Sequence, residues 1–133
     1  MATVKIAPAL LASAALLLSG CGGGIYFSFS GDAGSDDQPP AVSLTTAAGS
    51  AAAGDRVHLA AAATDDDFVA VVSFYRLEDD GSRSFVGSDS RAPYEVDATM
   101  PDVPRGTTVR FFADAVDSAG QHATSAAVAI NAL

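Results

Sequence analysis

The chain has 133 residues, among them 16 acidic residues, seven basic residues and one cysteine. Lys5 is the only lysine, so residues 21–133 carry six arginines and a side-chain charge balance of −10. This acidic balance argues against nucleic-acid binding and against charge-driven adhesion to anionic lipid. A lone cysteine also excludes an internal disulfide framework.

Residues 1–20 have the pattern of an export signal. Lys5 supplies a positive charge, residues 6–18 are almost all apolar, and Ser19 and Gly20 are small. A basic start, a short apolar stretch and a small-residue exit are typical of a secretory signal peptide. The apolar stretch is shorter than the roughly 20 residues that a membrane span needs. We therefore exclude residues 1–20 from the fold prediction.

The end of this signal, Leu18-Ser19-Gly20-Cys21, resembles the lipobox of bacterial lipoprotein precursors. The resemblance implies cleavage before Cys21, a diacylglyceryl group on its thiol and acylation of the new amino group. Two or more acyl chains anchor a protein stably, at about 0.8 kcal/mol for each buried CH₂. The alternative is an ordinary secreted protein with an unpaired cysteine.

The same resemblance predicts the location of the protein. A lipid on Cys21 would hold it in a bacterial cell envelope, with the membrane as partner through the anchor. The residue after the cysteine is Gly22 and not an aspartate. In Gram-negative lipoproteins an aspartate at this position commonly favours retention in the inner membrane, so its absence here resembles the pattern of lipoproteins sorted to the outer membrane.

Residues 21–38 are predicted to form a tether. Glycines at 22–24 and the Gly, Asp and Pro residues of 31–40 are typical of linkers, and about 20 such residues span roughly 25 Å as a coil. Residues 25–30 differ, because they are aromatic and alternate like a strand. They have two interpretations: a segment that docks on a membrane interface or a partner, or an extra edge strand of the domain.

From residue 39 to residue 133, strand-like segments alternate with turn signals about every ten residues, a spacing typical of a β-sandwich or barrel. The hydrophobic alternation places Val72, Phe74 and Phe111 in the core, and Ala126, Val128 and Ile130 inward on the last strand. We expect strands over residues 41–46, 56–64, 69–77, 83–87, 94–99, 107–117 and 122–131. Seven such strands over about 90 residues are typical of an all-β, Ig-like sandwich.

Five segments in order resemble bacterial Ig-like domains of extracellular proteins. They are PAVSL at 40–44, VHLAAAATD at 57–65, VSFY at 72–75, APY at 92–94 and ADAVDSAG at 113–120. The resemblance covers residues 39–131 and implies the same sandwich. One hairpin departs from the pattern, because residues 76–83 are longer and more charged than usual and Arg76 stands where an apolar residue is common.

The sequence carries no recognisable catalytic motif. His58 and His122 lie outside any metal-ligand spacing, and there is neither a nucleophile elbow nor a phosphate-binding loop. We therefore expect no enzyme and no cofactor beyond the lipid. The predicted function is a non-catalytic interaction or scaffold module with an unidentified protein partner. The alternative is a calcium- or carbohydrate-binding module.

Asp65, Asp66 and Asp67 follow the second predicted strand, and Asp117 ends the sixth. In an Ig-like sandwich these two loops lie at the same end. Because Ca²⁺ prefers oxygen ligands, the four carboxylates form a candidate metal site. The alternative is that they only accept hydrogen bonds from backbone N–H groups in turns. The family resemblance supports that alternative, since it places Asp at 65 and 117 in many domains without a metal.

Outward positions of three predicted strands form a second candidate site. The interaction patch comprises Tyr75, Arg110, Phe112 and Val116, with Asp114 at its border. Exposed apolar patches of this kind mark interfaces. The alternative is that residues 25–30 or the long hairpin cover it.

Overall fold

The computed structural model describes residues 37–133. The predictions for the signal peptide, for lipidation of Cys21 and for residues 25–30 lie outside the described residues. Within residues 37–133 no helix is long and apolar enough to cross a membrane.

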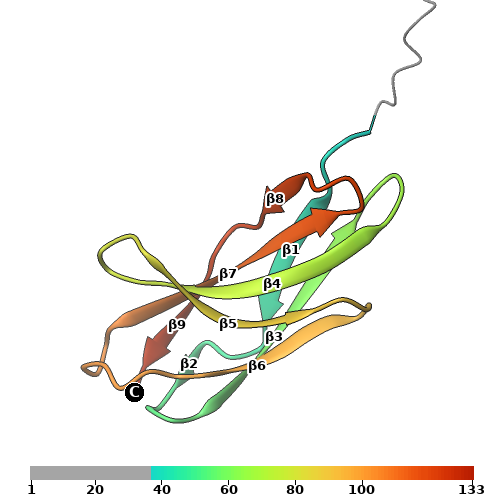
Figure 1. Cartoon of the computed structure of the whole chain (residues 1–133). Coiled ribbons are helices and arrows are strands. Elements are labelled where there is room, and N and C mark those ends of the chain that lie inside the picture. Colours follow the sequence, from blue (N-terminus) through green and yellow to red (C-terminus); the bar gives the residue numbers. More distant parts are fainter. Residues whose placement is uncertain (1–36) are drawn as a thin grey trace, which may run out of the picture. The chain divides into compact units, whose positions relative to one another are not determined.

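The regular secondary structure of the described residues consists of β-strands (Figure 1). The strands are β1 (Ala41–Thr46), β2 (Ser50–Ala51), β3 (Arg56–Thr64), β4 (Val69–Leu77), β5 (Arg83–Asp89), β6 (Tyr94–Thr99), β7 (Thr108–Asp117), β8 (His122–Thr124) and β9 (Val128–Ala132). One sheet has the order β1-β3-β6, and the other has the order β2-β9-β7-β4-β5 with β8 pairing to β7. This all-β sandwich confirms the predicted fold class.

The core lies between the two sheets and is made by alternate residues of their long strands. Leu59 of β3, Phe74 of β4 and Phe111 of β7 are almost fully buried. Their neighbours in sequence point to the outer faces, because successive side chains of a strand lie on opposite sides of the sheet. The inward positions predicted for β4 and β7 are therefore confirmed.

The prediction of one continuous strand over residues 122–131 is wrong, because the structure has two strands there, β8 and β9. Between them, Ser125 exchanges hydrogen bonds with Ala113 of β7: its N–H donates to the carbonyl of Ala113, and its Oγ accepts from the N–H of Ala113. This local bonding interrupts the alternation, so Ala126 is exposed where we expected it in the core. Ile130 is buried as predicted.

A second difference is β2, which lies between the strands predicted over residues 41–46 and 56–64. Ser50 and Ala51 pair with Asn131 and Ala132 of β9 in parallel. Ala51 is buried, and its carbonyl accepts a hydrogen bond from the N–H of Leu133. The segment is a strand because the last strand offers it a partner, which a local pattern of small residues does not reveal.

The charged hairpin between β4 and β5 keeps its predicted turn, with Gly81 in the left-handed region at φ 86°. The Nε of Arg76 donates a hydrogen bond to Glu78 Oε1 at 2.9 Å. Ser84 also donates to this carboxylate. Hydrogen bonds from Arg76 and Ser84 hold the pKa of Glu78 below its ordinary value. An arginine is tolerated at this inward position because the carboxylate of Glu78 accepts its hydrogen bonds.

The two ends of the described chain lie at opposite ends of the sandwich (Figure 1). Ala41 pairs with Thr64, at the end where β3 and β7 finish. Asn131 of β9 pairs with Thr108, where β7 begins. Residue 37 is therefore close to the β3–β4 loop and the β7–β8 turn, whereas Leu133 is a strand's length away.

The core predicts a sharp contrast between two phenylalanines. Phe74→Ala should lower the free energy of unfolding by about 3–5 kcal/mol, because it removes a fully buried ring and leaves a cavity. Phe85→Ala should change it by about 0.5 kcal/mol or less, because Phe85 is 63% exposed. Urea unfolding followed by far-UV circular dichroism measures both changes, and equal losses would contradict the packing described.

Candidate functional site

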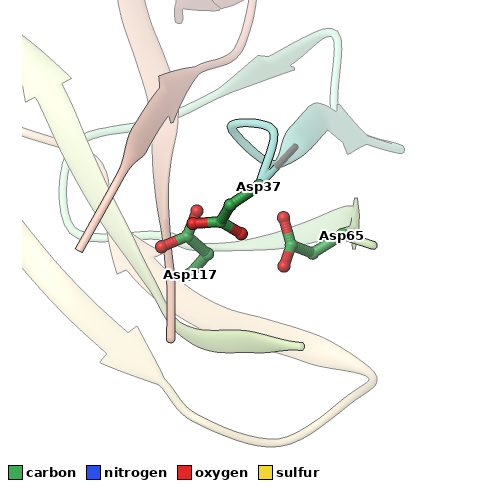
Figure 2. Close-up of side chains that lie close together, drawn as sticks. All are labelled: Asp37, Asp65 and Asp117. Atoms are coloured by element: carbon green, nitrogen blue, oxygen red, sulfur yellow. The ribbon is translucent and has the colours of Figure 1, made fainter. Parts of the chain in front are cut away.

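Three aspartates from distant parts of the chain meet at one end of the sandwich (Figure 2). Asp37 precedes β1, Asp65 directly follows β3, and Asp117 is the last residue of β7. One carboxylate oxygen of each lies within 4.8 Å of the others. We call this group the acidic cluster.

Asp117 is the most buried member, at 2% exposure. Its Oδ1 accepts hydrogen bonds from the backbone N–H groups of Ala119 and Gln121, both at 2.8 Å. This oxygen shapes the β7–β8 turn. Its Oδ2 is buried and has no hydrogen-bond partner among residues 37–133.

The other two aspartates are bonded in a similar, one-sided way. Asp65 Oδ2 accepts from the N–H of Asp67 at 3.1 Å, while its Oδ1 is buried and has no partner within the described part of the chain. Asp37 Oδ2 accepts from Nε2 of Gln121 at 2.7 Å, and this amide also bonds the carbonyl of Asp37. The turn interpretation thus accounts for one oxygen of Asp65 and one of Asp117, and leaves the other oxygen of each without a partner.

The structure brings together only part of the predicted metal site. Asp65 and Asp117 converge as expected, but Asp66 and Asp67 are exposed and lie outside the acidic cluster. Asp67 instead accepts a hydrogen bond from Ser118 Oγ at 2.7 Å. Asp37 takes part although the sequence assigned it to the tether. The one available signal is its position directly before the first strand.

Carboxylates as close as those of the acidic cluster repel one another when they are charged. At 4 Å, two like charges repel by about 1 kcal/mol in water and about 4 kcal/mol near a protein surface. No lysine, arginine or histidine forms an ion pair with Asp37, Asp65 or Asp117 among residues 37–133. A cation at this place would remove the repulsion.

The predicted interaction patch contains a row of aromatic rings on the outer face of the larger sheet. Tyr75 of β4 pairs with Phe112 of β7 on one side and with Phe85 of β5 on the other. Tyr75 and Phe112 stack with ring centroids 5.4 Å apart, and Phe85 meets Tyr75 edge to face at 5.7 Å. The guanidinium of Arg83 lies 5.0 Å from the centre of the Tyr75 ring.

Exposure differs strongly along this row. Phe112 is 9% exposed, because the ring of Tyr75 stacks beside it, whereas Phe85 is 63% exposed. Leu77 lies two residues after Tyr75 on β4, and it pairs with Arg83 of β5 and with Arg110 of β7. We define the aromatic face as Tyr75, Phe85, Phe112, Arg83 and Arg110.

The remaining residues of the predicted patch are separated from the aromatic face. Asp114 lies between Phe112 and Val116 along β7, and its carboxylate bonds Thr124 at 3.1 Å and His122 at 3.2 Å. Val116 is half-buried on the far side of this polar group. Phe85 and Arg83 were missed, and the pairing of the two strands around the Asp-Gly turn is the signal that could have found them.

His58 lies on the outer face of the smaller sheet beside two carboxylates. Its Nδ1 is 3.0 Å from Asp97 Oδ1, and its Nε2 is 3.8 Å from Glu95 Oε1. The hydrogen bond to Asp97 raises the pKa of His58 above its ordinary value. His58 is therefore a surface group whose charge responds to mild changes of pH.

Comparison with known proteins decides the family. Residues 40–126 match the family described as bacterial Ig domain. The chain belongs to this family. No match was found among curated protein sequences.

A solved structure of similar fold supports the sandwich of the bacterial Ig domain. The fibronectin(III)-like modules of CbhA from Clostridium thermocellum match with a TM-score of 0.57 and 23% identity, over 69% of this chain and 94% of that chain. The pectate lyase PelI from Erwinia chrysanthemi, solved in complex with tetragalacturonic acid, matches with a TM-score of 0.47 and 21% identity. That second match covers 66% of this chain and 27% of the lyase. Bacterial Ig domains are typically non-catalytic.

The contact between His58 and Asp97 predicts a pH-dependent contribution to the stability of the bacterial Ig domain. Since the folded-state pKa of His58 lies above 6.5, the contribution is fully present below about pH 6.5 and is lost as the pH rises through the folded-state value. Asp97→Asn should move the pKa of His58 back toward about 6.5 and flatten this dependence.

An NMR titration of the His58 ring measures the pKa directly. Asp102→Asn, in an exposed loop, makes the same change of charge away from His58 and should leave its titration unchanged. Identical midpoints for His58 in the parent and in Asp97→Asn would contradict the role of the hydrogen bond.

Proposed function

We propose that this protein is a lipid-anchored bacterial Ig domain that binds another envelope protein, without catalysis, through the aromatic face. The family supports a non-catalytic module. The lipobox supports an anchor at Cys21 and a place in the cell envelope, at the outer membrane if the cell is Gram-negative. The acidic charge of residues 21–133 disfavours nucleic acid as a partner.

The exposed ring of Phe85 is the observation that carries this proposal. A phenylalanine that is 63% exposed beside the Tyr75–Phe112 stack presents apolar surface that is already ordered. Binding through ordered side chains costs little further conformational entropy. Tyrosine and arginine beside an apolar anchor are also typical of residues that contribute most to protein interfaces.

Two of the three rings of the aromatic face are covered, which leaves little flat surface on which a sugar could stack. A sugar ring stacks on an open aromatic face. The ring of Tyr75 instead stacks on Phe112 and lies beneath the guanidinium of Arg83. Phe112 is buried, so Phe85 is the member of the row that offers open surface.

The charge of the aromatic face favours a partner with an acidic surface. Arg83 and Arg110 form no ion pair with any acidic residue among residues 37–133. They stand on either side of Leu77 in register, across β5, β4 and β7. Complementary charge across an interface sets orientation and speeds association, and carboxylates of a partner would pair with these guanidinium groups.

Substitution of the aromatic face should abolish capture of the partner. We expect Phe85→Ser with Arg110→Glu to reduce the recovery of a crosslinked partner from the protein's own envelope by about tenfold or more. Both side chains are exposed, so the fold should persist, and circular dichroism checks this. Arg56→Glu, on β3 of the other sheet, is the matched control and should capture the partner normally. Equal recovery with all three proteins would contradict a role for this face.

Loss of the thiol at Cys21 should prevent lipid anchoring of the protein. Cys21→Ser should leave unprocessed precursor, because the thiol that takes the lipid is missing. Any cleaved form should be poorly retained, because about 0.8 kcal/mol of burial is lost for each CH₂ of the missing chains. Ser19→Ala keeps a small residue in the lipobox and should be processed and retained normally. Gel mobility and detergent-phase partitioning measure the outcome, and normal cleavage together with full membrane retention of Cys21→Ser would disprove the anchor.

A further inference from the structure

We infer that Asp37, Asp65 and Asp117 bind a calcium ion that ties the start of the domain to the β3–β4 loop and the β7–β8 turn. This inference goes beyond the interaction proposed for the aromatic face and does not depend on it. The acidic cluster stands at the end of the sandwich where the chain enters β1 (Figures 1 and 2).

A buried oxygen of Asp117 that lacks a hydrogen-bond partner is the first observation in favour of a bound ion. The residue is 2% exposed, and its Oδ2 has no hydrogen-bond partner among residues 37–133. Burying a charged oxygen without a partner is costly, so native structures seldom leave one unsatisfied. Asp65 Oδ1 is in the same condition. Two such oxygens, together with the carboxylate of Asp37, point to a ligand that accepts electron pairs from all three.

The turn hydrogen bonds leave the buried oxygens free for that ligand. Asp117 uses Oδ1 for the N–H groups of Ala119 and Gln121, and Asp65 uses Oδ2 for the N–H of Asp67. Each carboxylate is thus fixed by one oxygen while the other has no protein partner. Ligands oriented in this way by surrounding hydrogen bonds lose little freedom when a metal binds.

The donor set selects the chemical class of the ion. Carboxylate oxygens are hard ligands, and the acidic cluster contains neither histidine nor cysteine, the side chains that favour zinc and copper. Ca²⁺ accepts six to eight oxygens in irregular arrangements, whereas Mg²⁺ demands a near-ideal octahedron and keeps several waters. Three aspartates from separate segments, completed by water, fit calcium better.

Calcium would strengthen a contact between residue 37 and the β7–β8 turn that Gln121 already makes. Its Nε2 donates to Asp37 Oδ2 at 2.7 Å and to the carbonyl of Asp37 at 3.1 Å. The first described residue is therefore held near Asp117 by a neutral amide. An ion shared by the acidic cluster would add a strong link between segments that are distant in sequence, and binding to the folded state alone stabilises that state.

Thermal unfolding of the full chain, with Cys21→Ser to prevent acylation, tests the inference. At about 1 mM calcium, in the range of extracellular calcium modules, we expect the Tm to rise by about 4–8 °C relative to EDTA. Asp37→Asn and Asp117→Asn should abolish this rise. Asp66→Asn, in the same loop but outside the acidic cluster, is the matched control and should keep it. Calorimetric titration should give one calcium ion per chain.

Asp37→Asn tests the calcium site even if Asp117→Asn does not fold. In EDTA, Asp37→Asn should unfold at the same temperature as the parent or higher, because it relieves repulsion between carboxylates. A missing calcium response in the parent, or an equal response in the parent and Asp37→Asn, would overturn the site. An equal rise with magnesium at the same concentration would overturn its assignment to calcium.

Discussion

Strand β7 is the constraint on which the rest of the structure depends. It is paired with β4 on one side and with β8 and β9 on the other. Its inward side chains, such as Phe111, fill the core, and its outward Phe112 supports the stack with Tyr75. Its last residue, Asp117, brings a buried carboxylate to the end of the sandwich. Core, aromatic face and acidic cluster are therefore positioned by one strand whose ten residues alternate between the two faces of the sheet.

Much of the fold could be predicted because apolar alternation records which face of each strand is buried. Phe74 and Phe111 are in the core for that reason. The break in the last strand could not be predicted, because it depends on Ser125 bonding the backbone of Ala113 across the sheet. Such a contact leaves no periodic trace in the sequence. A local pattern encodes burial well and encodes the partners of polar groups poorly.

The candidate sites show the same division. The convergence of Asp65 and Asp117 follows from the topology of the sandwich, which places their loops at one end. The participation of Asp37 does not follow, because linker composition says nothing about which residue contacts the domain. Phe85 joins the aromatic face because β5 pairs with β4 through a β-bulge after Phe74, which shifts the register. A bulge of one residue decides which side chain meets Tyr75.

The opposite placement of residue 37 and Leu133 has a mechanical consequence. Tension applied between these two points would run along the strands, so the hydrogen bonds of β1 with β3 and of β9 with β7 would be loaded in shear. Bonds loaded in this way must break together, whereas bonds at a peeled edge break one at a time. A domain arranged like this is therefore loaded along its strands under such tension, and it is not peeled from one edge.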